Sequence, residues 1–149
     1  MVSDHKCRPV LAEDQNWDVA LFNELASTPA TMEASRVADI YSCFKGHSME
    51  GRDVEQAYLQ AYLEGTPTYI TLPKELWTEK MHSMRDPVVR LERALYGHKN
   101  SGVFWQRYCR TQVEQAGFEV ISENWPCVFW NKDTSMLLIV YVDEMQLSG

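Results

Sequence analysis

The sequence lacks any long apolar segment, because its longest uninterrupted apolar run extends only from Met136 to Val142. A membrane-spanning helix needs about 20 apolar residues, so we expect no association with a membrane. The N-terminal residues Met-Val-Ser-Asp-His-Lys are followed by no apolar stretch, and they therefore show no secretory signal.

Paired cysteines are also absent. The four cysteines are scattered and form no C-x-x-C motif, which argues against a disulfide framework and against a structural zinc site. We expect a reducing, intracellular setting, in which each cysteine is a small buried hydrophobe. They are Cys7, Cys43, Cys109 and Cys127.

Basic residues are scarce. Lys and Arg number 14 against 21 Asp and Glu, and the net charge is -7. This balance argues against binding nucleic acid by bulk charge, so such a role needs a local basic surface. Residues 85–110 hold one, with aromatic residues interleaved, which suits a nucleic-acid backbone or a triphosphate. The solvated face of an amphipathic helix explains it equally well. Its basic residues are Arg85, Arg90, Arg93, Lys99, Arg107 and Arg110.

What is present is enough for one globular domain. The chain has 149 residues, of which 45% are hydrophobic, and shows no internal repeat or linker. Thr28-Pro29 starts a predicted helix over 29–45, with Val37, Ile40, Tyr41 and Phe44 on one face. A weak strand over 47–53 and a helix over 54–63 follow.

The remaining pattern is mostly of strands. It predicts a strand over 68–72, a polar connector over 73–87, a mixed segment over 88–95 and a loop over 97–102. An apolar stripe from Phe104 to Ala116 predicts a helix that ends at Gly117. Strands are predicted over 118–121, 127–131 and 136–142, and the last should be covered on both faces. The fold class is therefore α+β, a mainly antiparallel sheet with packed helices.

Acidic residues lie at the ends of two predicted strands. Asp143 and Glu144 directly follow the most apolar predicted strand, where a divalent cation such as magnesium or a solvated hairpin turn would each account for them. Asp53 ends a predicted strand. It can bind a metal or, with Gln56 three residues later, cap the next helix.

Three segments in a fixed order carry a family resemblance. They are Asp53-Val-Glu-Gln-Ala-Tyr58-Leu-Gln, then Arg90-Leu-Glu-Arg-Ala-Leu-Tyr-Gly97-His-Lys-Asn-Ser101-Gly-Val-Phe-Trp105, then Leu137-Leu-Ile-Val-Tyr-Val-Asp143-Glu144. With Gly117-Phe118 and Trp125-Pro-Cys-Val-Phe129 they resemble the reverse transcriptase of copia-type LTR retrotransposons. The resemblance covers roughly residues 6 to 149.

That resemblance implies the fingers-and-palm part of a right-handed polymerase, over residues 1–149. Its chemistry joins a dNTP to a primer 3′-OH on an RNA or DNA template, with two Mg²⁺ or Mn²⁺ ions. It implies that Asp53, Asp143 and Glu144 are the catalytic and metal-binding acids. It also implies that Tyr58, Tyr96, Gly97 and Lys99 bind substrate, Tyr58 lying under the sugar, and that Lys6 and Arg8 are remnants of a basic finger strand.

The chain also departs from that family. The family's last acid is Asp, and Glu144 reaches about 1.5 Å further, which predicts impaired catalysis. Gly102 stands where the family often has Pro. The second strand of the hairpin after Asp143 is expected to be barely begun, leaving an exposed sheet edge. The thumb, RNase H, integrase and protease are expected to be absent.

Two functions from different classes therefore stay open. The first is a polymerase domain of a Pol polyprotein, active in a cytoplasmic particle or in the nucleus. The second is a non-catalytic, degenerate remnant that keeps the palm fold and binds nucleic acid at most weakly. Magnesium or manganese binding through Asp53 and Asp143 distinguishes them.

Overall fold

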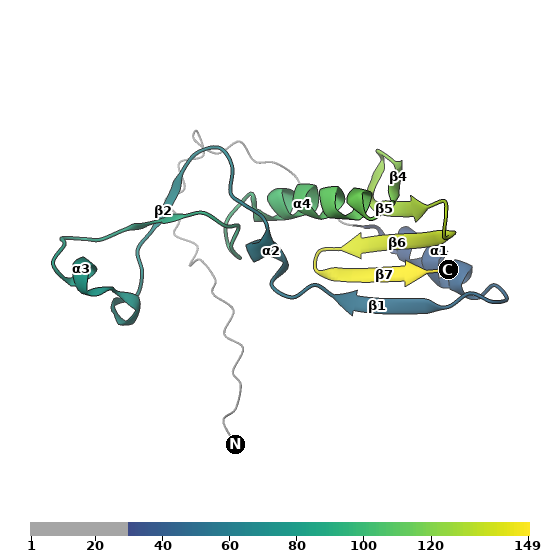
Figure 1. Cartoon of the computed structure of the whole chain (residues 1–149), viewed down its shortest axis with the longest axis horizontal. Helices are drawn as coiled ribbons and strands as arrows, with labels where there is room; N and C mark the ends of the chain where they lie inside the picture. The colour runs from purple at the N-terminus through teal and green to yellow at the C-terminus, as the bar shows by residue number, and fades with distance from the viewer. Residues whose placement is uncertain (1–29) are drawn as a thin grey trace, which may run out of the picture.

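A computed structural model describes residues 30–149, so the predictions for Lys6, Cys7 and Arg8 lie outside the described residues. The chain combines helices with a five-stranded antiparallel sheet in the order β1-β7-β6-β5-β4, which confirms the mixed helix and antiparallel sheet character (Figure 1). No helix within residues 30–149 is long and apolar enough to cross a lipid bilayer. The strands are β1 (Met49–Asp53), β4 (Glu119–Ser122), β5 (Trp125–Asn131), β6 (Met136–Tyr141) and β7 (Glu144–Ser148).

A second, two-stranded sheet lies apart from the first (Figure 1). It pairs β2 (Thr68–Ile70) with β3 (Val89–Leu91) in antiparallel register. The intervening segment, predicted as a polar connector, also contains a 3₁₀ turn (Lys74–Leu76) and the short helix α3 (Glu79–His82). The mixed segment before Gly97 therefore begins with a strand.

Helix α4 (Ser101–Gln115) forms the main core on one face of the large sheet. Its side chains Trp105, Cys109 and Val113 pack against alternate residues of β5 and β6. Alternation puts successive strand residues on opposite faces, so the neighbours of these residues face the other helix layer. Every residue from Leu137 to Val140 is buried, which confirms that β6 is covered on both faces.

Helix α1 (Met32–Ser42) covers the opposite face, where Ala34 and Ala38 pack on Val128, Leu137 and Ile139. The predicted apolar stripe was wrong for three of its four residues, which are Val37, Ile40 and Phe44, at 46%, 64% and 58% exposed. Small alanine side chains let the helix backbone approach the bulky residues of β5 and β6 closely. The packing is decided by that fit and not by residue hydrophobicity.

The predicted helix over 54–63 is also wrong in extent. Only α2 (Ala57–Gln60) is helical, and it starts after Gln56, which has a left-handed φ of 52°. The chain then becomes extended at Ala61, because residues 61–63 form backbone hydrogen bonds with residues 92–94. The N-cap residue of α2 is Gln56, so the interpretation of Asp53 as the cap of this helix is wrong.

Strand β7 corrects the expectation for the hairpin that follows β6. It is a strand of five residues, hydrogen-bonded to β6 on one side and to β1 on the other. The exposed edges of the sheet are therefore β1 and β4, and the strand after Asp143 leaves no open edge. Interior placement satisfies the backbone of β7 on both sides.

The cysteines divide by position. Cys109 and Cys127 are buried in the α4 core, as predicted, and burial raises the pKa of the Cys109 thiol to about 11. Cys43 is exposed after α1, so its predicted burial is wrong. Cys7 lies outside the described residues.

Gly117 ends α4 with a φ of +88°, as the stop signal predicts. Its amide donates to the Glu114 carbonyl at 3.0 Å, and the Phe118 amide donates to the Val113 carbonyl. We expect Gly117→Ala to lower the free energy of unfolding by about 1–2 kcal/mol, because a Cβ is unfavourable in this conformation and would lie 3.3 Å from Asn131. Urea denaturation measures this change.

Gly51→Ala is the matched control for that substitution. Gly51 lies in β1 with no positive φ, and a Cβ there would meet no atom within 4 Å. Its stability should stay equal or rise slightly, since alanine has less conformational freedom to lose. An equal loss in both variants would contradict the conformational argument for Gly117.

Candidate functional site

The three candidate acids meet at one end of the large sheet. Asp53 is the last residue of β1 and lies directly opposite Glu144, the first residue of β7. The Val54 amide donates to the Asp143 carbonyl at 2.7 Å, which continues the pairing into the turn. Cross-strand partners have Cβ atoms about 4.5–5.5 Å apart and point to the same face. Residues far apart in the sequence thus form one acidic end of the sheet.

The turn between β6 and β7 consists of Val142 and Asp143, and Glu144 is already paired in β7. Val142 has a φ of 55°, which is a genuine outlier for a β-branched residue. Such a conformation costs about 1–3 kcal/mol and persists only where the surroundings determine it. The Trp105 indole N–H donates to the Val142 carbonyl at 2.5 Å. The turn that contains Asp143 is therefore strained, and a hydrogen bond from Trp105 on α4 stabilises it.

The donor chemistry of this end suits a hard divalent cation, because carboxylate oxygens are the ligands that magnesium prefers. Within residues 30–149, however, no three acidic, histidine or cysteine side chains are grouped closely enough to hold a metal ion. Like-charged carboxylates repel one another without a cation between them. The backbone brings Asp53 and Glu144 together, while the ligand oxygens are not gathered around one point.

An open groove of about 900 Å³ runs beside Asp53 and Glu144 on the α1 face. Asp53, Glu144 and Tyr141 line it from the sheet, and Thr31 and Met32 line it from the start of α1. The acidic end is therefore reachable by a ligand from solvent.

Two candidate tyrosines contact each other, and one of them, Tyr58, lies near Asp143. The rings of Tyr58 on α2 and Tyr96 have centroids 4.5 Å apart. Burial, then Tyr96, then the charge of Asp143 raise the pKa of the Tyr58 phenol above its usual value. The Asp143 contribution requires that its carboxylate be near that phenol. The structure thus brings together two candidate substrate-binding residues and one candidate acid.

Backbone pairing explains why these tyrosines meet. The Leu63 amide donates to the Glu92 carbonyl and the Ala94 amide donates to the Ala61 carbonyl, each at 2.9 Å. Arg93 reinforces this pairing, because its guanidinium stacks 3.5 Å from the Tyr62 ring centroid. The segments after Tyr58 and before Tyr96 are fixed side by side.

The loop that carries Tyr96, Gly97 and Lys99 is clamped by buried polar groups. The Ser101 hydroxyl donates to the Leu95 carbonyl at 2.7 Å and accepts from the Leu95 amide at 3.0 Å. Gly97 has a φ of +89°, which favours glycine there. Lys99 is exposed on this loop.

Comparison with known proteins decides the family. A family model described as reverse transcriptase (RNA-dependent DNA polymerase) matches residues 2–149. The chain belongs to the reverse transcriptase family. The resemblance to copia-type retrotransposon reverse transcriptases predicted from the three ordered motifs is confirmed.

Similar relatives come from Saccharomyces cerevisiae. They include the transposon Ty1-DR4 and TyH3 Gag-Pol polyproteins and the truncated transposon Ty1-A Gag-Pol polyprotein. Each is 33% identical over 96 residues, which is 64% of this chain. The matched segment is 5% of the first two relatives and 7% of the third, so this reverse transcriptase sequence spans a small part of their length. No solved structure matches it.

His98 joins this clamped loop of the reverse transcriptase to strand β2. The Asn100 amide donates to Nδ1 of His98 at 3.2 Å, so the ring proton is on Nε2 and donates to the Thr68 hydroxyl at 3.2 Å. Both side chains are buried. Burial lowers the pKa of His98 below its usual value.

We expect this histidine to make the reverse transcriptase less stable in acid. Because the folded-state pKa lies below the unfolded value of about 6.5, the unfolded state binds more protons in the window between them. The free energy of unfolding should therefore fall as the pH drops below about 6.5 and level off below the folded pKa. Urea midpoints between pH 7.5 and 5 measure it. His98→Gln should remove this slope, and the exposed-site control His82→Gln should keep it.

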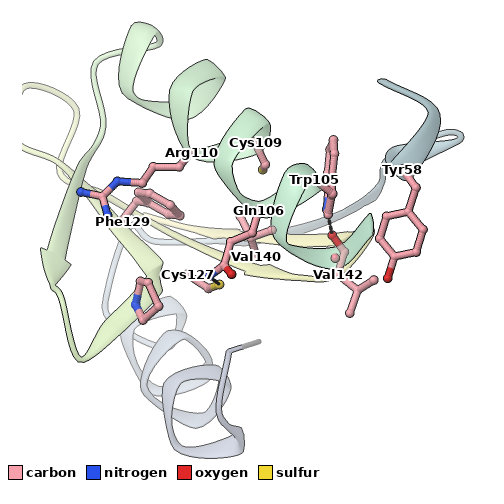
Figure 2. Close-up of a pocket in the computed structure, with 11 residues that line it drawn as sticks. Tyr58, Trp105, Gln106, Cys109, Arg110, Cys127, Phe129, Val140 and Val142 are labelled. Atoms are coloured by element: carbon pink, nitrogen blue, oxygen red, sulfur yellow. Dashed lines mark hydrogen bonds between the residues drawn. The ribbon is translucent and has the colours of Figure 1, made fainter. Parts of the chain in front are cut away.

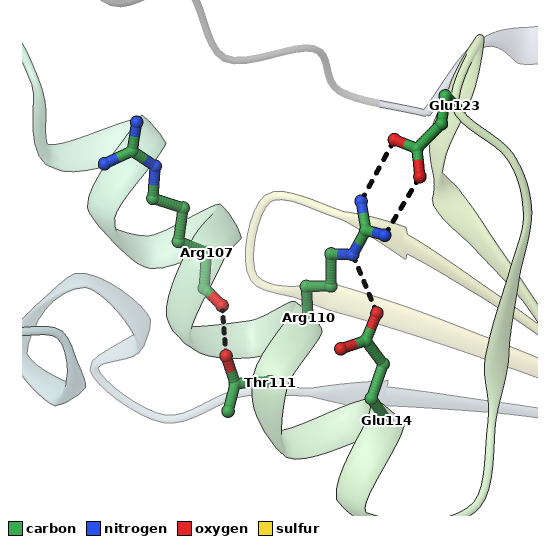
Figure 3. A network of polar contacts seen from close by, with 5 residues as sticks. All are labelled: Arg107, Arg110, Thr111, Glu114 and Glu123. Carbon is green, nitrogen blue, oxygen red and sulfur yellow. Dashed lines mark hydrogen bonds and ion pairs between the residues drawn. The ribbon is translucent and has the colours of Figure 1, made fainter.

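The basic residues of 85–110 do not form one free cationic surface. Arg110 on α4 donates to Glu114 at 2.8 Å and to both carboxylate oxygens of Glu123 (Figure 3). These hydrogen bonds raise the pKa of Arg110 and lower that of Glu123. Arg85 pairs with Asp86 at 3.7 Å. Since Arg93 stacks on Tyr62, Arg93 and Arg110 act within the fold, while Arg85 lies on its surface.

A small cavity of about 40 Å³ lies between α4 and the sheet, beneath the turn (Figure 2). Tyr58, Trp105, Cys127 and Val142 are among its lining residues. The Gln106 amide donates to Cys127 Sγ at 3.3 Å on its wall.

Ser101 and Trp105 belong to the second of the three motifs, but the sequence alone assigned neither of them a role. Ser101 is 2% exposed, and its hydroxyl closes the loop by a hydrogen bond to the Leu95 carbonyl six residues earlier. A buried serine six residues after a loop carbonyl is too weak a pattern to predict such a clamp. The role of Trp105 depends on a contact with Val142 that no local pattern contains.

Proposed function

We propose that the chain is the fingers-and-palm part of an RNA-directed DNA polymerase, which transfers a nucleotide from a dNTP to a primer 3′-OH. The family membership supports it. The observation that carries it is the pairing of Asp53 with Glu144 beside the Asp143 turn, which gathers the three acids expected from the motifs at one open end of the sheet.

In this proposal Asp53, Asp143 and Glu144 hold two Mg²⁺ or Mn²⁺ ions. When bound, the ions stabilise charge on the attacking and leaving oxygens of an in-line displacement. The chain's own contribution is to fix Asp53 and Glu144 on paired strands, since sites on regular elements are more precise than sites on loops. Asp143 lies in the short turn between β6 and β7. The 3′-oxygen forms a bond to the α-phosphorus while the bond from that phosphorus to the α,β-bridging oxygen breaks. Pyrophosphate leaves, and the proton of the 3′-hydroxyl passes to water.

The substrate side of the site is assigned to Tyr58, Tyr96, Gly97 and Lys99. Contact between the two tyrosine rings sets a firm aromatic surface beside Asp143, and such a surface suits a sugar or base face. Because Gly97 has no Cβ, a phosphate or base can come close to its backbone. Lys99 supplies positive charge at the same loop.

The proposed partners are an RNA or DNA template-primer and a dNTP. Because the similar relatives are Gag-Pol polyproteins, we also propose that the chain acts as a segment of a Pol polyprotein. The groove beside Asp53 and Glu144 gives a nucleic-acid strand access to the acids.

A primer-extension assay tests the proposal. The full chain is incubated with a 5′-labelled primer on an RNA or DNA template, with Mg²⁺ or Mn²⁺ and one dNTP at a time. We expect addition only of the nucleotide complementary to the template, and none after chelation of the ion. Folding of the chain is checked by a cooperative unfolding transition. Equal addition of all four nucleotides, or no addition with either ion by the folded chain, would refute the catalytic proposal.

A further inference from the structure

One buried side chain contacts the strained turn from the face of the sheet that α4 covers. Trp105 on α4 is 4% exposed, and its indole points from the helix to the turn (Figure 2). Its Nε1–H donates to the Val142 carbonyl, while the Val54 amide donates to the next carbonyl, that of Asp143. Two successive peptide groups of the turn are therefore each held by one hydrogen bond from a different element.

The first of these bonds bears on the orientation of Asp143. The Val142 carbonyl and the Asp143 amide belong to one planar peptide group. A hydrogen bond that fixes the direction of the Val142 carbonyl therefore also fixes the peptide plane that contains the Cα of Asp143. Since Val142 is held at a φ of 55°, where a β-branched residue does not rest unaided, loss of the bond frees the turn to relax.

Side-chain packing does not replace that bond. The cavity of about 40 Å³ next to the indole is lined by Trp105, Val142 and Tyr58. Atoms that line a pocket have fewer packed neighbours on that side than atoms of the close-packed core. The turn is thus loosely packed at the point where the hydrogen bond acts.

We propose that Trp105 is a positioning residue that holds the Asp143 carboxylate in place through the Val142 carbonyl. This inference rests on the proposed polymerase function for its catalytic consequence, though not for the hydrogen bond itself. An error of about 1 Å in the position of a reacting group can cost about 100-fold in rate.

The experiment replaces Trp105 with Phe, which keeps an aromatic ring and removes the N–H donor. Trp77→Phe is the matched control, because the Trp77 indole also donates to a backbone carbonyl, that of Leu72 at 2.8 Å, in the segment between β2 and α3. We expect Trp105→Phe to lower kcat of primer extension by about 100-fold with KM for dNTP changed by less than about threefold. Trp77→Phe should leave kcat unchanged.

A second variant relieves the strain directly. Glycine tolerates a positive φ, so Val142→Gly should keep the turn without help from the indole. We expect the loss caused by Trp105→Phe to shrink from about 100-fold to under about tenfold in the Val142→Gly background. A loss of the same size in both backgrounds would overturn the positioning role.

A readout independent of activity separates this inference from the proposed function. In ¹H–¹⁵N spectra of the full chain, the Trp105 indole proton should exchange slowly, and Trp105→Phe should shift the Asp143 amide signal while Trp77→Phe leaves it in place. If the chain extends no primer but these spectra behave as expected, the catalytic proposal fails and the structural role of Trp105 stands. Fast exchange of that indole proton, or an unmoved Asp143 signal, refutes the inference itself.

Discussion

Replacing Asp143 with Asn is expected to abolish Mn²⁺ binding at the acidic end of the sheet and to lower nucleotide incorporation by about 10³-fold or more. Asn keeps the shape of the side chain and removes its charge. A bound ion contributes several kcal/mol of charge stabilisation, and each 1.36 kcal/mol is tenfold in rate. The turn itself should survive, because its contact with Val54 uses the backbone carbonyl. Calorimetric titration with Mn²⁺ and single-nucleotide primer extension measure the two effects.

The same variant has a second readout, in Tyr58. The Asp143 charge contributes to the raised pKa of this phenol, after burial and Tyr96. Asp143→Asn should therefore lower the pKa of Tyr58 toward its usual value, as followed by ultraviolet titration. The control is Asp133→Asn in the exposed turn between β5 and β6, at the other end of the hairpin. If Asp133→Asn reduces Mn²⁺ affinity equally, the ion binds by surface charge and the site assignment is wrong.

Shortening Glu144 to Asp is expected to raise the rate of primer extension, by up to about 100-fold. The extra methylene of Glu moves its carboxylate about 1.5 Å outward, and functional groups must be held within about 0.5 Å of the productive geometry. Because Glu144 starts β7 directly opposite Asp53, its backbone position is fixed by two neighbouring strands. The substitution thus changes reach without changing register. The initial rate at saturating dNTP is the quantity to compare.

Glu119→Asp is the matched control for that gain. Glu119 is also an exposed glutamate that begins a strand, β4, and it pairs with Trp130 on the far side of the sheet. Its substitution should leave the rate unchanged. An equal or lower rate for Glu144→Asp than for the natural chain would show that the length of this side chain does not limit catalysis.

Much of the acidic end could be anticipated from the order of the motifs. The apolar segment before Asp143 predicted a buried strand, and that strand is β6, covered on both faces. The expectation that Asp53 and Asp143 lie close together came from the family resemblance and not from any local pattern. A strand pairing between residues so far apart leaves no trace in local periodicity.

The errors arose where tertiary contacts outweigh local preference. The α1 stripe was assigned to the largest apolar residues, whereas the sheet accepts Ala34 and Ala38 because close approach needs small side chains. Likewise, α2 ends early because the chain after Tyr58 pairs with residues 92–94, a partner that helical spacing cannot reveal. In both cases the deciding neighbour lies elsewhere in the sequence.

The backbone hydrogen bonds between residues 61–63 and 92–94 make the intervening segment, with β2, α3 and β3, an excursion whose two ends lie side by side. The entropy of closing a flexible loop rises slowly, by only about 0.6 kcal/mol for each doubling of its length. Insertions or deletions around α3 can therefore be absorbed without separating Tyr58 from Tyr96. The bond between Thr68 and His98 ties β2 to the loop of Tyr96. Changes of length around α3, further out in the excursion, can leave the aromatic pair in register.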